Sequence, residues 1–183
     1  MQPQTISPDA QTKPITVVVV DDHPLIHEAV QSLIDKHEDI ELVGTGLDGD
    51  DVFHLVETHK PDILLLDLEM PQSRTGNTGQ RFRALPTIAQ LRKKDPQTAP
   101  IILSQHLLRP LINRAVEYGL RGYLLKSDGL SLEVPDAVRS VSQGGLAFSE
   151  TIHKEVFAEN SSGASELTES CLLYTSPSPR DPE

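Results

Sequence analysis

The segment Ile63-Leu64-Leu65-Leu66-Asp67 is the clearest indication of the class of fold. It is an apolar run without a polar interruption, and it ends at a carboxylate. Short continuous runs of this kind are typical of strands that are buried on both faces of a parallel sheet. Four more occur along the chain, at residues 15–20, 40–43, 101–103 and 122–125. The sequence therefore predicts five buried strands.

The stretches between these runs have the periodicity of amphipathic helices. Leu25-Ile26, Ala29-Val30 and Leu33-Ile34 recur every four residues and form one apolar stripe. Leu111-Ile112 and Ala115-Val116 repeat this spacing, and weaker versions lie in the other intervals. Strand and helix alternate five times, which predicts an α/β fold with a parallel sheet and helices on both faces.

Length and composition limit the possible classes of protein. The 183 residues are 37% hydrophobic and 23% charged, as expected of a globular chain with one main domain. No apolar run approaches the roughly 20 residues that a membrane helix needs. The single cysteine, Cys171, excludes an internal disulfide. We therefore expect a cytoplasmic protein without membrane contact, and the net charge of −11 argues against direct binding of nucleic acid.

Reactive side chains follow four of the five predicted strands. Asp21 and Asp22 follow the first, Asp67 the third, Ser104 the fourth and Lys126 ends the fifth. Parallel α/β sheets bind ligands at the carboxyl ends of their strands, so we expect these groups to converge. Three carboxylates suit a Mg²⁺ ion with water and a phosphate oxygen. Asp67 is then the candidate nucleophile towards a phosphoryl group, which Lys126 and Ser104 would contact.

Each of these residues also has a purely structural explanation. An Asp after a strand is most often a turn or capping residue, and Asp21-Asp22 could cap a helix that starts near Pro24. Their joint placement after four different strands favours the functional interpretation. His23, beside the acid pair, is interpreted as a surface residue. The acidic residues between 48 and 51 lack the Gly and Glu of a calcium loop, and they predict a turn and a helix cap.

Three segments resemble the receiver domain of two-component response regulators, namely residues 17–24, 62–71 and 121–126. The Asp-Asp-His-Pro start and the Gly-Tyr-Leu-Leu-Lys segment are most similar to the NarL/FixJ branch, whose members usually carry a LuxR-type DNA-binding domain. The resemblance covers residues 15–146. It implies a flavodoxin-like (βα)5 doubly wound parallel sheet with strand order 2-1-3-4-5.

The resemblance also implies a role for each candidate residue at the metal site. Asp67 would be the phosphoacceptor, and Asp21 and Asp22 would be the Mg²⁺-binding acid pair. The backbone carbonyl of Glu69 would be a further ligand of the ion.

The remaining candidates would transmit the signal. Ser104 and Lys126 would contact the phosphoryl group, and Tyr123 would be an aromatic switch that turns inward when Ser104 moves. A sensor histidine kinase would donate the phosphoryl group, and phosphorylation would favour a homodimer. The domain would phosphorylate and dephosphorylate itself with Mg²⁺ rather than act as an enzyme, and it would regulate transcription through a DNA-binding domain.

The sequence departs from the pattern of that family in three places. Gln72–Arg81 resembles an insertion beside the site, Gln105 replaces a small residue, and Ser127 stands where many members have proline. The insertion is expected to alter kinase choice or the lifetime of the phosphoryl group. Gln105 is expected to narrow access to the site.

Outside residues 15–146 the regular pattern is lost. Residues 1–14 are expected to form a disordered arm, and residues 147–165 a linker. Glu166-Leu167-Thr168-Glu169 resembles the opening of a LuxR-type helix-turn-helix domain, but residues 171–181 resemble a translated sequencing adapter. Residues 166–183 are therefore expected to hold the truncated start of the helix-turn-helix domain, followed by a tail derived from the adapter. The rest of the DNA-binding domain is expected to be missing from this chain.

Two other classes of protein remain open. Leu65-Leu66-Asp67-Leu68-Glu69 resembles the nucleophile strand of haloacid dehalogenase-type hydrolases, although that family has Asp where this chain has Glu69. Rapid multiple-turnover phosphatase activity would favour it. A protein-interaction module with the same fold would instead fail to bind Mg²⁺.

Overall fold

A computed structural model of the chain describes residues 13–75, 79–128 and 130–154. The expected N-terminal arm up to residue 12, the linker from 155 on, and the helix-turn-helix and adapter interpretations lie outside the described residues. In the described part, no helix is long and apolar enough to cross a membrane.

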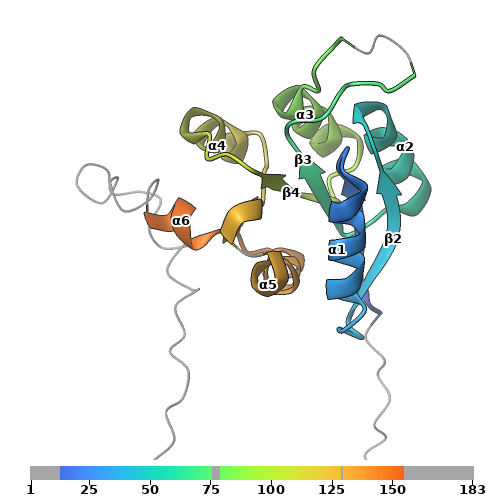
Figure 1. The fold of residues 1–183 in the computed structure, drawn as a ribbon, viewed down its shortest axis with the longest axis vertical. Helices are drawn as coiled ribbons and strands as arrows, with labels where there is room; N and C mark the ends of the chain where they lie inside the picture. Colours follow the sequence, from blue (N-terminus) through green and yellow to red (C-terminus); the bar gives the residue numbers. More distant parts are fainter. Residues whose placement is uncertain (1–12, 76–78, 129, 155–183) are drawn as a thin grey trace, which may run out of the picture.

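A single parallel sheet of six strands forms the centre of the molecule, in the order β2-β1-β3-β4-β5-β6. Figure 1 labels β2, β3 and β4 of this sheet. The strands are β1 (Ile15–Val20), β2 (Ile40–Gly46), β3 (Ile63–Asp67), β4 (Ala99–Ser104), β5 (Gly122–Leu125) and β6 (Ala147–Phe148). The predicted order of the first five is confirmed. Because β3 and β4 run one residue further than the apolar pattern, Asp67 and Ser104 are the last residues of their strands.

Helices cover both faces of the sheet, as predicted. α1 (Pro24–Ile34) and α5 (Leu130–Ser142) pack on one face, and α2 (Gly49–His59), α3 (Ala84–Lys94) and α4 (Arg109–Glu117) pack on the other (Figure 1). A short 3₁₀ helix, η1 (Lys126–Asp128), follows β5. Alternate residues of β3 enter the two cores, and all of them are buried, which explains the continuous apolar run.

The sheet continues past residue 146, where we expected the linker to begin. β6 pairs in parallel with β5, and a short helix, α6 (Glu150–Ile152), follows it. The Ile152 side chain is completely buried in the core on the α2–α4 face. A strand of two residues is too short to show a periodic pattern in the sequence. β6 forms because the edge of β5 offers it a partner for pairing. The expected linker boundary at 147 is therefore corrected for residues 147–152.

The acidic turn before α2 is a helix cap, as predicted. The Asp48 carboxylate accepts hydrogen bonds from the backbone N–H groups of Asp50 and Asp51, and its other oxygen accepts one from the backbone N–H of Arg74 at 2.8 Å. It thus fixes both the first turn of α2 and the start of the loop after β3.

Replacing this cap should lower stability measurably. We expect Asp48→Ala to reduce the free energy of unfolding by about 1–2 kcal/mol, because several backbone N–H groups lose their acceptor. Urea unfolding followed by circular dichroism measures the change. Asp35→Ala, at an exposed carboxylate, is the control, with an effect within about 0.5 kcal/mol. Equal stabilities of the two variants would contradict the capping role.

An ion pair joins α5 to the loop before β2. Arg139 donates from Nε and Nη2 to the two carboxylate oxygens of Asp39, at 2.7 and 2.8 Å. These hydrogen bonds lower the pKa of Asp39 from 3.8 to about 2. Because the folded-state pKa is depressed, the contribution to stability is present above pH 3.8 and is lost as the pH falls through about 2.

The titration of Asp39 tests this ion pair. NMR of the carboxyl carbon should give a pKa of about 2 in the wild type. In Arg139→Gln the pKa should return towards 3.8, because the guanidinium that stabilises the carboxylate is gone. Identical titration curves for the two proteins would show that the contact does not form in solution.

Candidate functional site

Four strand ends place the predicted residues along one edge of the sheet. β1 and β3 are neighbours, with Val20 opposite Leu66, so Asp21 and Asp22 emerge beside Asp67. β4 lies on the other side of β3 and ends at Ser104. The strand order, which no single segment encodes, is what brings these residues together.

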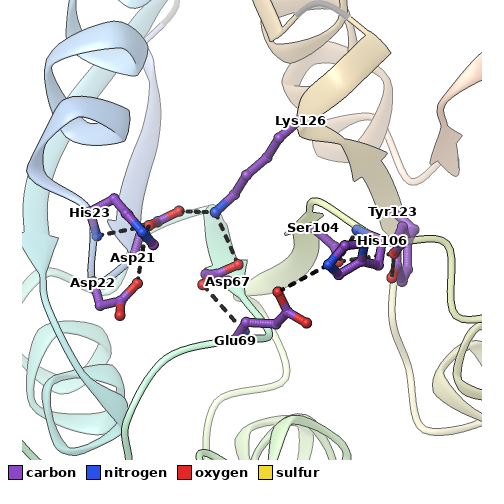
Figure 2. Close-up of polar contacts among 9 residues, drawn as sticks. All are labelled: Asp21, Asp22, His23, Asp67, Glu69, Ser104, His106, Tyr123 and Lys126. Carbon is purple, nitrogen blue, oxygen red and sulfur yellow. Dashed lines mark hydrogen bonds and ion pairs between the residues drawn. The ribbon is translucent and has the colours of Figure 1, made fainter.

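Lys126 reaches across this edge to two carboxylates (Figure 2). Its Nζ lies 2.6 Å from Asp21 Oδ2 and 3.0 Å from Asp67 Oδ1. The exposed fractions of the three side chains are 7%, 0% and 2% for Lys126, Asp21 and Asp67, so the contacts are shielded from bulk water. One buried ammonium thus offsets the charge of two buried carboxylates.

A third carboxylate completes an acidic cluster. One potential ligand atom from each of Asp21, Asp22, His23 and Asp67 lies within 4.8 Å of the others. Asp21 Oδ2 and Asp22 Oδ1 are buried, and their close partners are the Lys126 ammonium and the His23 ring. His23 Nδ1 lies 2.7 Å from Asp22 Oδ1. His23 is therefore part of the cluster, and it is also the exposed surface residue that the sequence predicted beside the acid pair.

Burial and charge act in opposite directions on the ionisation of the buried residues. Burial raises the pKa of Asp67, the Lys126 ammonium lowers it, and the Asp21 carboxylate raises it further, so that the net shift is upward. Burial by itself would lower the pKa of Lys126, but its contacts with Asp21 and Asp67 outweigh that effect and raise it. The Lys126 ammonium therefore stays charged beside the Asp67 carboxylate.

Ser104 and Tyr123 meet at the backbone of His106. Ser104 Oγ donates to the His106 carbonyl at 3.0 Å and accepts from the His106 N–H at 3.1 Å. The Tyr123 hydroxyl donates to the same carbonyl at 2.7 Å, and its ring is completely buried. Burial also raises the pKa of the Tyr123 phenol. Tyr123 thus points inward in this structure, and the loop after β4 connects it with Ser104.

Glu69 and His106 face each other across the mouth of the site. The Glu69 N–H donates to Asp67 Oδ2 at 3.2 Å, and Glu69 Oε2 lies 3.7 Å from His106 Nε2 (Figure 2). Sequence reasoning did not select His106. Its position two residues after Ser104, at the end of a predicted strand, was the available signal.

The loop that resembles an insertion has an ordered base. Pro71 and Arg81 form an antiparallel bridge, and Gln72 N–H donates to the Gln80 carbonyl at 2.9 Å. Residues 76–78 lie outside the described part. Beside the bridge is an open cavity of about 690 Å³, lined by residues that include Glu69, Arg81 and Leu108. Gln105, the second departure, is exposed.

The arrangement combines the requirements for chemistry on an anionic group. It has a buried carboxylate at a fixed strand end, two more carboxylates able to bind a hard cation, and a charged ammonium. A hydroxyl group lies on the neighbouring strand end.

Comparison with known proteins agrees with this arrangement. The family model described as "Response regulator receiver domain" matches residues 17–131. The transcriptional regulatory protein DesR of Bacillus subtilis is 32% identical over 145 residues, which are 79% of this chain and 67% of DesR. DegU of Brevibacillus brevis is 30% identical, over 72% of this chain and 51% of DegU. The chain thus spans between half and two thirds of these relatives.

Solved structures show the same fold. A two-component response regulator of the LuxR family from Aurantimonas sp. SI85-9A1 has a TM-score of 0.70 at 25% identity, covering 81% of this chain and 99% of that chain. The signal receiver domain of the response regulator NarL from Mycobacterium tuberculosis has a TM-score of 0.62 at 31% identity, covering 73% and 99%. The chain therefore belongs to the response regulator receiver domain family, within the NarL/LuxR group of transcriptional regulators.

Proposed function

We propose that the domain accepts a phosphoryl group on Asp67 from a histidine kinase and thereby controls a transcriptional output. The observation that carries this proposal is the contact of one buried lysine, Lys126, with both Asp21 and Asp67 at the edge of a receiver fold. Such a site is built to neutralise charge around a single reactive carboxylate.

The donor set fits a magnesium ion. Carboxylate oxygens are the ligands that Mg²⁺ prefers, and Asp21, Asp22 and Asp67 offer them within one small volume. Buried oxygens of Asp21 and Asp22 belong to this cluster, and the ion would offset the charge that these carboxylates share with Asp67. We also assign the Glu69 backbone carbonyl to this ligand set. When bound, the ion would offset the charge of the phosphoryl oxygens.

The protein groups have separate tasks in the transfer. The Asp67 carboxylate attacks the phosphorus of a phosphohistidine in line with the leaving imidazole, forming an acyl phosphate while the P–N bond breaks. Lys126 pairs with a phosphoryl oxygen, and the Ser104 hydroxyl donates to another. Hydrolysis of the acyl phosphate by water returns the carboxylate and resets the signal.

Movement of Ser104 would carry the signal to Tyr123. Both side chains now bond to the His106 carbonyl, so a Ser104 drawn to the phosphoryl group changes the hydrogen bonding of the tyrosine. The altered surface near α4 and β5 would favour a homodimer or the release of the output domain. In this family that domain is a separate one, which binds DNA.

Incubation with acetyl phosphate and Mg²⁺ tests the function. Intact mass spectrometry should show one added phosphoryl group, which does not form when EDTA is present from the start, and peptide mapping should place it on Asp67. No added mass would overturn the proposal. Rapid multiple turnover of the donor without stable labelling would favour the hydrolase alternative, and failure to bind Mg²⁺ would favour the interaction module.

A further inference from the structure

Ser149, directly after β6, is buried where β5 ends. Its Oγ accepts a hydrogen bond from the Leu125 N–H at 2.7 Å and donates one to Glu133 Oε2 on α5, also at 2.7 Å. Its own N–H donates to the Tyr123 carbonyl at 3.1 Å. The residue is only 1% exposed, so these bonds are shielded from water. Ser149 therefore connects three elements around the last residues of β5.

The hydroxyl of Ser149 takes the place of a missing strand residue. β6 pairs with β5 only at Gly122 and Tyr123, opposite Ala147 and Phe148, so on this side of β5 no carbonyl of β6 stands opposite Leu125. The buried Leu125 N–H would otherwise lack an acceptor. The Glu133 carboxylate orients the Ser149 hydroxyl by accepting its proton, which leaves an oxygen lone pair directed at Leu125.

Leu125 directly precedes Lys126 in the chain, so a hydrogen bond to the Leu125 N–H restrains the backbone next to Lys126. We propose that Ser149 and Glu133 are positioning residues for the phosphoryl chemistry, because they fix the peptide from which Lys126 reaches Asp21 and Asp67. Neither residue contacts the acidic cluster, and both act through the backbone of Leu125. The inference rests on the proposed function and adds to it a role for the segment after residue 146.

Two further contacts show that this segment is a built part of the domain. A Cβ atom at Gly122 would lie 2.8 Å from the Ala147 carbonyl oxygen, so the close approach of β6 requires glycine there. The Ile152 side chain is fully buried in the same core as Tyr123. The packing of β6 against Gly122 and the burial of Ile152 thus restrain the segment on both sides of Ser149. Its hydrogen bonds therefore restrain the backbone next to Lys126.

The rate of labelling by acetyl phosphate in saturating Mg²⁺ tests the proposal. Ser149→Ala should slow labelling about tenfold, since small misplacements of a catalytic group cost up to about 100-fold. Ser149→Thr, which keeps a hydroxyl, should restore most of the rate. Glu133→Gln should give a smaller loss and serves as a second variant if Ser149→Ala folds poorly. Ser142→Ala, on the exposed surface of α5, is the matched control and should leave the rate unchanged.

A double-mutant cycle separates positioning from a general loss of structure. In a Lys126→Met background the Ser149→Ala substitution should have no further effect on the labelling rate, because its target is gone. An equal fold-loss in both backgrounds, or no loss in the wild type, would overturn the inference while the proposed function stands. A wild-type protein that takes up no phosphoryl group would overturn the proposed function and this inference with it.

Discussion

Asp67→Asn should abolish phosphoryl uptake. The amide cannot attack phosphorus, and loss of a nucleophile lowers rates by at least about 10³-fold, so labelling by acetyl phosphate should become undetectable. Intact mass spectrometry measures the result. Asp35→Asn, at an exposed carboxylate directly after the C-terminal end of α1, is the control and should be labelled like the wild type. A labelled Asp67→Asn protein would show that another residue is the acceptor.

The same substitution should stabilise the fold at neutral pH. Burial raises the pKa of Asp67, so its ionised form costs free energy of folding that the neutral, similarly shaped Asn avoids. A group with a raised folded-state pKa stabilises the protein most below its unfolded-state pKa, and this contribution is lost as the pH rises through the folded-state value. The advantage of Asp67→Asn should therefore shrink as the pH falls and Asp67 becomes protonated. Urea unfolding without divalent cations at several pH values measures it, and an advantage that grows towards low pH would contradict the argument.

Lys126→Met should lower stability strongly in the absence of divalent cations. The substitution keeps most of the side-chain stem but removes the only ammonium within ion-pair distance of Asp21 and Asp67 among the described residues. Removing one partner of a buried ion pair costs about 3–5 kcal/mol, because the remaining charges lose their compensation. Chemical unfolding in EDTA measures the loss. Lys154→Ala, at an exposed pair with Glu150, should change stability by less than about 0.5 kcal/mol.

Magnesium provides a second test of the same variant. We expect Mg²⁺ to raise the free energy of unfolding of Lys126→Met more than that of the wild type. In the variant the ion binds carboxylates whose charge is not offset by the Lys126 ammonium. Phosphoryl uptake in saturating Mg²⁺ should still fall by about 10²–10³-fold, as when one charge-stabilising donor is removed. A variant as stable as the wild type in EDTA would show that Lys126 does not compensate the two buried carboxylates.

The local pattern of the chain was sufficient to predict the strands near the site. β1 and β5 have the predicted bounds, because almost all of their residues are buried and apolar, so that the apolar run coincides with the strand. The pattern does not report the exact length of β2, β3 and β4. These strands continue through residues whose polarity resembles that of a loop, such as Thr45, Asp67 and Ser104.

The alternation of strands and helices, the family and the strand ends at which the reactive residues lie could all be predicted from the sequence, since they depend on neighbouring residues and on short motifs. Three features became visible in the folded chain alone: Lys126 contacts two carboxylates, His23 joins the acidic cluster, and β6 and Ser149 complete the edge beside Lys126. Each of these contacts depends on the direction of a side chain or on a free strand edge in the folded molecule. Residues far apart in the chain meet there because the cores on both faces of the sheet hold the strands in one order.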